Sequence, residues 1–336
     1  MARAQKELLS QLLKEVSRSF YLTLRVLPGA IRPQIGLAYL LARTTDTIAD
    51  TDLVPLEQRL QALQALRERI LGLGTAPLEL GVLAGQQASP AERVLLESCE
   101  ASLALLRTLS PADQQLVQAV LQIITSGQEM DLRRFAGACA ARIVALPTDA
   151  ELDDYTYRVA GCVGEFWTKL CRAHLFPDDP LDDTALLANG VRFGKGLQLV
   201  NILRDLPRDL RQGRCYLPAE RLGAAGLQPE DLLEPANEPR LRPVYGLYLD
   251  RAEGHLLAAG AYTNALPRRS VRVRLACAWP ILIGRETLNL LRVGNVLDPR
   301  QRIKVSRQHV RRLQLRSVFL YPWAGAWERL VSAPVG

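Results

Sequence analysis

The segment GKGLQLVNILRDLPRDLRQGRCYLP, residues 194–218, has a pattern that few other parts of the chain share. Apolar residues cover most of a predicted helix, while polar side chains recur every three or four residues along one face. That face carries Gln198, Asn201, Asp205 and Asp209. Two carboxylates one turn apart repel each other, so a cation is expected between them and an anionic partner. Since the ligands are all oxygen atoms, the pattern favours Mg²⁺, which completes its shell with water and phosphate oxygens.

A second acidic pair lies far upstream in YLLARTTDTIAD, residues 39–50. Asp46 and Asp50 are again four residues apart, with Tyr39 and Arg43 on adjoining turns of the same face. A lone pair at this spacing is usually the solvated face of an ordinary helix, but two pairs on two helices favour a shared role. Facing one another across a helical bundle, they would form a site for Mg²⁺ ions and a diphosphate.

Four segments together resemble the squalene/phytoene synthase family of head-to-head trans-isoprenyl diphosphate synthases, and the first acidic motif looks most like its squalene synthases. They are SRSF (17–20), DTIAD (46–50) with Arg43, YTYRVAGCVG (155–164) and QLVNILRDLPRDLRQGRCYLP (198–218), in the order and spacing of the family over roughly residues 8–312. The resemblance implies an isoprenoid synthase fold, a helical bundle around a central cavity.

The rest of the chain also predicts an all-α fold. No stretch alternates with period two for long enough to indicate a strand. Residues 89–92, 110–113 and 148–151 each offer a hydroxyl N-cap followed by an acid at the third helical position. Residues 72–87 are rich in glycine and are expected to form a long surface loop. We expect one domain over residues 1–336, with residues 313–336 as a peripheral tail.

Roles for individual residues follow from the metal argument and from the resemblance. Asp46, Asp50, Asp205 and Asp209 are expected to bind Mg²⁺ and act in catalysis, and the resemblance implies that Tyr155 assists proton movement in the first half-reaction. Substrate contacts are expected from Ser17, Phe20, Tyr39, Arg43, Gln198, Asn201, Arg204, Arg214 and Tyr216. Contacts to NADPH are implied for Arg18, Lys304 and Arg307.

The glycines that follow Tyr155 allow two interpretations. Each glycine in a helix interior costs about 1 kcal/mol relative to alanine, so Gly161 and Gly164 indicate that something presses on the backbone. In the family that group is the isoprenoid tail. A close helix–helix contact requires small residues equally.

Three positions depart from the pattern of the family. Ala49 stands where squalene synthases often carry a third acid, and Pro207 between the aspartates of the second motif is expected to kink the helix near Leu203. The segment IKVSR, residues 303–307, is similar to the basic NADPH-contacting segment, but its arginine is displaced by one residue. Reduction is therefore less well supported than condensation.

Composition limits the kinds of partner. The 336 residues carry a formal net charge of +7, which favours anionic partners. No zinc-finger spacing, aromatic RNA-binding run or basic arm argues for nucleic acid. The six cysteines show no CxxC pairing, as expected of reduced thiols in a cytoplasm. We find neither a signal-peptide core nor a transmembrane segment, so the protein is expected in the cytoplasm.

The end of the chain combines basic residues from Arg300 to Arg312 with the aromatic segment VFLYPWAGAW, residues 318–327. Such a tail suits peripheral contact with an anionic membrane. A tail packed back on the body of the protein fits the sequence equally well.

The sequence thus predicts a prenyltransferase that joins two farnesyl diphosphates to presqualene diphosphate and reduces this intermediate to squalene with NADPH. A phytoene, dehydrosqualene or hydroxysqualene synthase shares the same motifs. A noncatalytic helical adaptor would explain the amphipathic helices and the basic tail, but would not need two acidic pairs.

Overall fold

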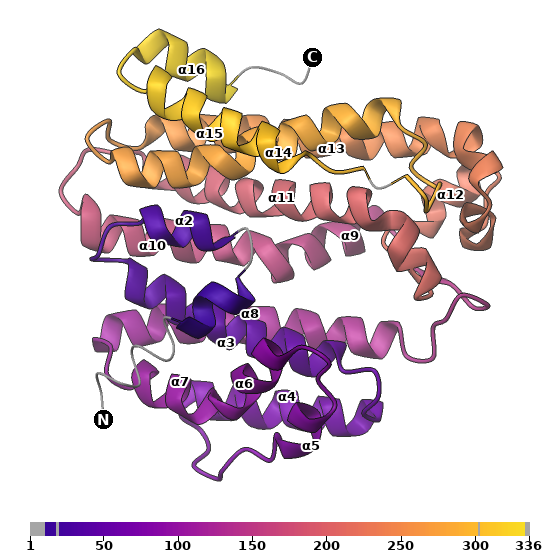
Figure 1. Ribbon diagram of the computed structural model, residues 1–336, viewed down its shortest axis with the longest axis horizontal. Helices are drawn as coiled ribbons and strands as arrows, with labels where there is room; N and C mark the ends of the chain where they lie inside the picture. The colour runs from indigo at the N-terminus through magenta and orange to yellow at the C-terminus, as the bar shows by residue number, and fades with distance from the viewer. Residues whose placement is uncertain (1–10, 18–19, 302, 333–336) are drawn as a thin grey trace. The chain divides into compact units, whose positions relative to one another are not determined.

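The computed structural model describes residues 11–17, 20–301 and 303–332, and these form an almost entirely α-helical protein (Figure 1). The prediction of an all-α isoprenoid synthase fold is confirmed. The strands among the described residues are β1 (Val144–Ala145) and β2 (Arg214–Cys215), which pair in parallel. The central cavity stays a prediction.

Contacts between residues divide the chain into two compact units. The first contains Met1–Ala136 and Lys169–Pro177, and the second contains Gly137–Thr168 and Asp178–Gly336. The helix α10 (Cys162–Leu175) contributes residues to both. The two acidic motifs therefore belong to different units.

The first unit is built around α3, which contacts α4, α6, α7 and α8. Residues 11–16 are helical, and the helices that follow are α2 (Phe20–Val26), α3 (Arg32–Asp50), α4 (Leu56–Leu71), α5 (Gly81–Gly85), α6 (Pro90–Glu97), α7 (Cys99–Leu106) and α8 (Pro111–Arg134). Leu41, Ile48, Leu63 and Leu66 are fully buried. Burying apolar side chains of this size contributes about 1.5–3 kcal/mol each, so this face of α3 is fixed by packing.

The segment predicted to be a surface loop, residues 72–87, is only partly one. It contains α5, which packs against α6, and Leu80, Leu83 and Ala84 are buried. The apolar residues between its glycines are buried because α5 packs on α6.

The second unit is built around the long helix α11 (Asp183–Arg211). Its other elements are α9 (Asp149–Thr156), the π-helical turn η1 (Tyr157–Gly161), α12 (Ala219–Ala224), the 3₁₀ turns η2 (Pro229–Leu233) and η3 (Pro235–Asn237), α13 (Glu238–Ala265), α14 (Val271–Val293), α15 (Arg307–Leu320) and α16 (Ala324–Ser332). The most extensive contact between described elements joins α11 to α13, and α11 also contacts α9, η1 and α14. These contacts explain why most of α11 is apolar and only one stripe of it is polar.

The end of the chain packs back on the second unit, one of the two arrangements expected. The indole of Trp327 is 2% exposed and donates a hydrogen bond of 2.9 Å to Oδ1 of Asn264. Its ring meets the ring of Tyr321 edge-on, with centroids 4.7 Å apart. Helix α16 is therefore anchored on α13, and α15 lies on α14.

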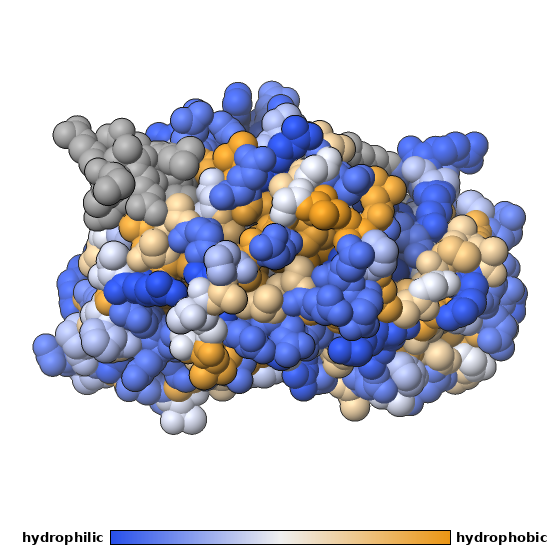
Figure 2. Space-filling view, turned by 90° about the horizontal axis from the view of Figure 1, so that it is seen from below, coloured by the Kyte–Doolittle hydropathy of each residue, from blue (hydrophilic) through white to orange (hydrophobic). Residues whose placement is uncertain are grey.

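The surface is mixed, as Figure 2 shows for one face of the molecule, where hydrophobic residues show between hydrophilic ones. Such a mixture is ordinary for a folded protein. Among the described residues, no helix combines the length and the apolar character needed to cross a membrane. All six cysteines are free, and Cys139 alone among them is exposed.

Candidate active site

The first acidic motif occupies the last turns of α3. Asp46 is partly buried, and Asp50, the final residue of the helix, is exposed. A carboxylate at the C-terminal end of a helix faces the negative end of the helix dipole, where a basic residue would be more stabilising. The last turn of α3 contains no basic residue. The helix dipole therefore does not explain the carboxylate of Asp50 at this position.

Arg43 links the motif to α6. Its guanidinium donates hydrogen bonds to the carboxylates of Asp46 and Glu92. Burial raises the pKa of Asp46, Arg43 lowers it, and the charges of Glu92 and Asp131 raise it further. Several carboxylates thus act on a site where Arg43 is the cation that pairs with Asp46, and an additional cation would relieve the repulsion.

Sequence reasoning missed Glu92 and Asp131. Glu92 was interpreted only as the acid of a helix cap, and its backbone N–H does donate to Oγ of Ser89 at 3.5 Å. Its side chain, however, turns to Arg43. Asp131 lies in the last turn of α8, and its charge acts on Asp46.

The second motif lies in the last three turns of α11. Leu199, Ile202, Leu203 and Leu206 are buried, and the polar stripe lies on the adjoining side of the helix. Gln198, Asp205 and Asp209 are partly buried, and Asn201 is exposed. The helical face predicted from the spacing is therefore confirmed.

Arg204 grips its neighbour Asp205 with two hydrogen bonds, of 2.8 Å from Nε and 2.6 Å from Nη2. This bidentate geometry is the strongest that a guanidinium makes with a carboxylate. Each acidic motif thus contains an aspartate bound by an arginine of the same helix.

Pro207 is accommodated inside α11 by a residue of α13. A proline has no N–H, so the carbonyl of Leu203, four residues earlier, loses its helical donor. The hydroxyl of Tyr245, a fully buried residue, donates to that carbonyl at 2.9 Å. Burial also raises the pKa of this phenol, which keeps it protonated. The side chain of Tyr245 therefore replaces the missing backbone donor, and α11 continues through the second motif to Arg211.

Tyr155 stacks on Tyr216. Their ring centroids are 4.8 Å apart with an angle of 25° between the planes, and each residue is 7% exposed. The third motif and the RCYLP segment, both in the second unit, are thus brought together. A π-helical turn begins two residues after Tyr155, and such turns occur frequently at functional sites.

Charged side chains hold the helix of Tyr155 in place. Asp153 of α9 accepts hydrogen bonds from Lys195 at 2.7 Å and from Arg251 at 2.8 Å. Burial would raise the pKa of Asp153, but these two cations outweigh it and hold the pKa below its usual value. Asp149 accepts a further hydrogen bond of 2.8 Å from Tyr248. Ion pairs and a buried tyrosine therefore tie α9 to α11 and α13.

The glycines after Tyr155 serve a helix–helix contact. A Cβ atom on Gly164 would lie 1.8 Å from the carbonyl oxygen of Gly190, and one on Gly194 would lie 2.1 Å from that of Ala160. Backbones can approach this closely only because Gly164 and Gly194 have no Cβ at the point of contact. Of the two interpretations offered by the sequence, packing against α11 explains Gly164 fully.

The RCYLP segment is part of the packed structure. Arg214 begins β2, which pairs with β1, and Gly213 before it adopts a positive φ of 79°. A Cβ on Gly213 would also lie 2.2 Å from the backbone nitrogen of Cys139. Arg214 is partly buried and Tyr216 is buried.

The other predicted site residues come from the N-terminal segment, from α3 and from the segment around the start of α15, and Tyr39 among them interacts electrostatically with Arg43. The hydroxyl of Ser17 is buried and donates to the carbonyl of Leu13, and the phenol of Tyr39 donates to the carbonyl of Val16 at 3.4 Å. Lys304 and Arg307 are exposed at the start of α15. Arg18 lies outside the described residues, and Phe20 begins α2.

The carboxylates of the two acidic motifs, all among the described residues, come in pairs and not in larger groups. Within the described parts of the chain, no group of three or more His, Cys, Asp or Glu side chains is arranged to hold a metal ion. An all-protein cage is therefore not formed by these residues. Mg²⁺ usually keeps water and substrate phosphate oxygens and takes one or two carboxylates, which is what each pair offers.

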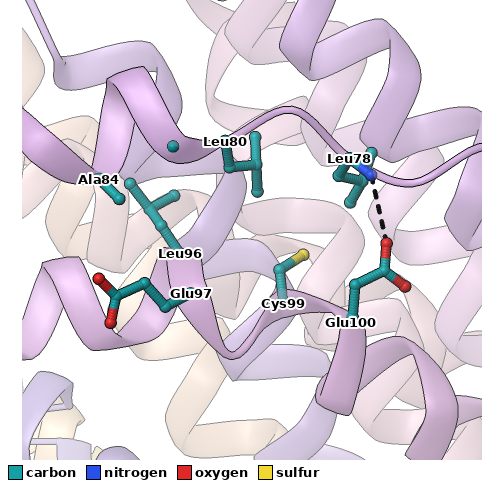
Figure 3. A pocket seen from close by; sticks show the side chains of 8 residues that line it. Leu78, Leu80, Ala84, Leu96, Glu97, Cys99 and Glu100 are labelled. Carbon is teal, nitrogen blue, oxygen red and sulfur yellow. Dashed lines mark hydrogen bonds between the residues drawn. The ribbon is translucent and has the colours of Figure 1, made fainter.

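A separate pocket in the first unit contains none of the motif residues. It has a volume of about 240 Å³ and is lined by Leu78, Leu80, Gly81, Ala84, Leu96, Glu97, Cys99 and Glu100 (Figure 3). The backbone N–H of Leu78 donates to Glu100 at 3.3 Å across its rim. Burial raises the pKa of the Cys99 thiol to about 12, so it is not a nucleophile at neutral pH.

Comparisons with known proteins agree with this geometry. The squalene/phytoene synthase family matches residues 13–309. A presqualene diphosphate synthase of Zymomonas mobilis is 33% identical over 75% of this chain and 73% of its own length. A presqualene diphosphate synthase of Rhodopseudomonas palustris is 31% identical over 86% of this chain and 88% of its own. The solved structure of TcSQS with the ligand E5700 shares the fold, with a TM-score of 0.74, 20% identity, and coverage of 98% of this chain and 97% of that one.

The matched span includes both acidic motifs, the YTYRVAGCVG segment and the RCYLP segment. The chain therefore belongs to the squalene/phytoene synthase family, whose enzymes are prenyltransferases that condense prenyl diphosphates head to head.

Proposed function

We propose that the protein condenses two molecules of farnesyl diphosphate to presqualene diphosphate and reduces that intermediate to squalene with NADPH. The observation that carries the proposal is the ion pair in each acidic motif, Arg43 with Asp46 and Arg204 with Asp205. In each pair the arginine would bind phosphate oxygens of the substrate, and the carboxylate would hold Mg²⁺.

Asp46, Asp50, Asp205 and Asp209 are the residues proposed to hold Mg²⁺. When bound, the ion supplies charge that stabilises the departing diphosphate. Arg43, Arg204 and Arg214 bind phosphate oxygens through their planar forks, while Gln198 and Asn201 orient the phosphates or their waters. Contacts that stabilise the negative charge of the departing diphosphate lower the barrier to its departure from the allylic carbon.

Tyr155 is proposed to move a proton in the first half-reaction. Its ring is held by stacking on Tyr216, and its helix is held by the ion pairs of Asp153, so the phenol has a fixed position. A fixed donor or acceptor loses little entropy when the reaction occurs. Tyr155→Phe is expected to lose presqualene diphosphate formation while still binding farnesyl diphosphate, and to convert supplied presqualene diphosphate normally.

The reductive step is proposed to use Lys304 and Arg307, two exposed cations suited to the phosphates of a dinucleotide. No GxGxxG motif is present in the sequence. Lys304→Ala should raise the NADPH concentration required without slowing the first condensation.

A synthase that stops at presqualene diphosphate is the second candidate, favoured by the names of the two bacterial relatives. Incubation with farnesyl diphosphate, Mg²⁺ and deuterium-labelled NADPH separates the candidates. The reductive proposal expects squalene that carries the label. Presqualene diphosphate that persists with NADPH present supports the second candidate, and an unlabelled C30 hydrocarbon or alcohol excludes the reductive reaction.

A further inference from the structure

The outer face of α15 exposes a group of apolar side chains that nothing in the proposed reaction requires. Leu315 is 71% exposed, Val318 51% and Phe319 68%, and Trp323 just after the helix is 55% exposed. The rings of Phe319 and Trp323 lie 5.3 Å apart. Leu315, Val318 and Phe319 lie on one side of the helix at helical spacing, and the ring of Trp323 lies against that of Phe319; we call these four residues the α15 apolar face.

The opposite side of α15 is already occupied by the body of the second unit. Leu313 and Ser317 are buried, and Ser317 accepts a hydrogen bond of 3.1 Å from the indole of Trp279 on α14. The helix, drawn in yellow near the top of Figure 1, is thus fixed on α14 and cannot turn its apolar face inward. Exposed apolar side chains held together on a fixed helix are typical of an interaction surface.

Positive charge surrounds this face. Arg311, Arg312 and Arg316 are exposed on α15, and none of the three forms an ion pair with another described residue. The sequence contains no aspartate or glutamate between Asp298 and Glu328. The partner that fits must therefore offer negative charge and an apolar layer together.

We propose that the α15 apolar face and its arginines dock the protein on an anionic lipid membrane. Tryptophan and phenylalanine partition to the boundary between headgroups and acyl chains, while arginines beside them bind anionic headgroups. The helix lies along the surface of the bilayer without crossing it. An acidic protein would pair with the arginines but would leave several of the apolar side chains uncovered.

Flotation of the full chain with lipid vesicles tests this assignment. We expect binding to vesicles that contain one quarter phosphatidylglycerol and little binding to pure phosphatidylcholine. The double variant Phe319→Ser/Trp323→Ser should lose at least about tenfold in affinity, because two aromatic groups no longer enter the interface. Arg311→Gln/Arg312→Gln should lose about 25-fold on anionic vesicles, since each basic residue near the surface contributes about fivefold.

The matched control is Leu53→Ser/Leu73→Ser, which removes two apolar side chains that are each 77% exposed in the first unit. It should bind vesicles like the wild type, and the melting temperatures of all variants should agree within a few degrees because the sites are exposed. Quenching of Trp323 by brominated lipid would support insertion. Equal losses in the control and the Phe319 variant, or wild-type binding by both α15 variants, would overturn the proposal. So would concentration-dependent self-association through this face in the absence of vesicle binding.

Discussion

Removal of the Tyr245 hydroxyl should destabilise the protein because it leaves the carbonyl of Leu203 without a donor. In the wild type that carbonyl accepts from Tyr245 at 2.9 Å, and the residue is fully buried. Pro207 has no N–H to take over. Tyr245→Phe keeps the ring and its packing, so the change isolates the hydrogen bond.

The expected cost is about 1–3 kcal/mol, the penalty for a buried carbonyl left unpaired. Pro207→Ala should change that cost, since alanine restores the backbone N–H that bonds the carbonyl four residues earlier. In the Pro207→Ala background, Tyr245→Phe should therefore cost at least about 1 kcal/mol less than in the wild type. The hydroxyl of Tyr245 should matter less in this background because the N–H restored by Pro207→Ala already bonds the carbonyl of Leu203.

Urea unfolding of the four proteins, namely wild type, both single variants and the double variant, measures the coupling directly. Tyr248→Phe is the matched control. Its hydroxyl lies one turn further along α13, is buried, and donates to Asp149 at 2.8 Å. Its loss should cost a similar amount but should not depend on residue 207. An equal cost of Tyr245→Phe in both backgrounds would refute the assignment of Tyr245 as a replacement donor.

Three further predictions concern the acids, the glycine contact and a partly buried histidine. Asp46→Asn and Asp205→Asn should each lower condensation by at least about 10²-fold with an unchanged melting temperature, and wild-type turnover in either would exclude the metal-binding role. Gly164→Ala should lower the melting temperature because its Cβ has no room, whereas Gly254→Ala, with nothing within 4 Å, should leave it equal or higher. Burial and nearby cations lower the pKa of His255 to about 4, so the free energy of unfolding should fall by about 2 kcal/mol as pH drops from about 6.5 towards 4. His255→Gln should flatten that fall. An unchanged pH dependence of the free energy of unfolding in urea would contradict the prediction.

The sequence predicted features that depend on neighbours along the chain. Helical spacing identified the polar stripe of α11, and the N-caps at Ser89, Ser110 and Thr148 all accept the expected backbone hydrogen bonds. These features require only the local periodicity and the chemistry of short side chains. Both motif helices and the class of fold were therefore accessible before the structure.

Features that depend on distant residues were not accessible. Pro207 was expected to kink α11, but the compensating donor, Tyr245, bonds a carbonyl 42 residues away, and no local pattern links the two. Glu92 contacts Arg43, which lies 49 residues earlier in the chain, and the local pattern around Glu92 indicates only a helix cap. Gly164 and Gly190 illustrate the same limit, since each glycine alone fits either a ligand or a neighbouring helix.

The central claim is that the protein joins two farnesyl diphosphates head to head, and the stoichiometry of diphosphate release tests it most directly. Pure protein is incubated with farnesyl diphosphate and Mg²⁺ without NADPH, and released diphosphate and consumed substrate are measured together. The account predicts one diphosphate released for every two farnesyl diphosphates consumed, with presqualene diphosphate as the C30 product. Release of one diphosphate for each farnesyl diphosphate, with only C15 alcohol or hydrocarbon formed, would contradict it.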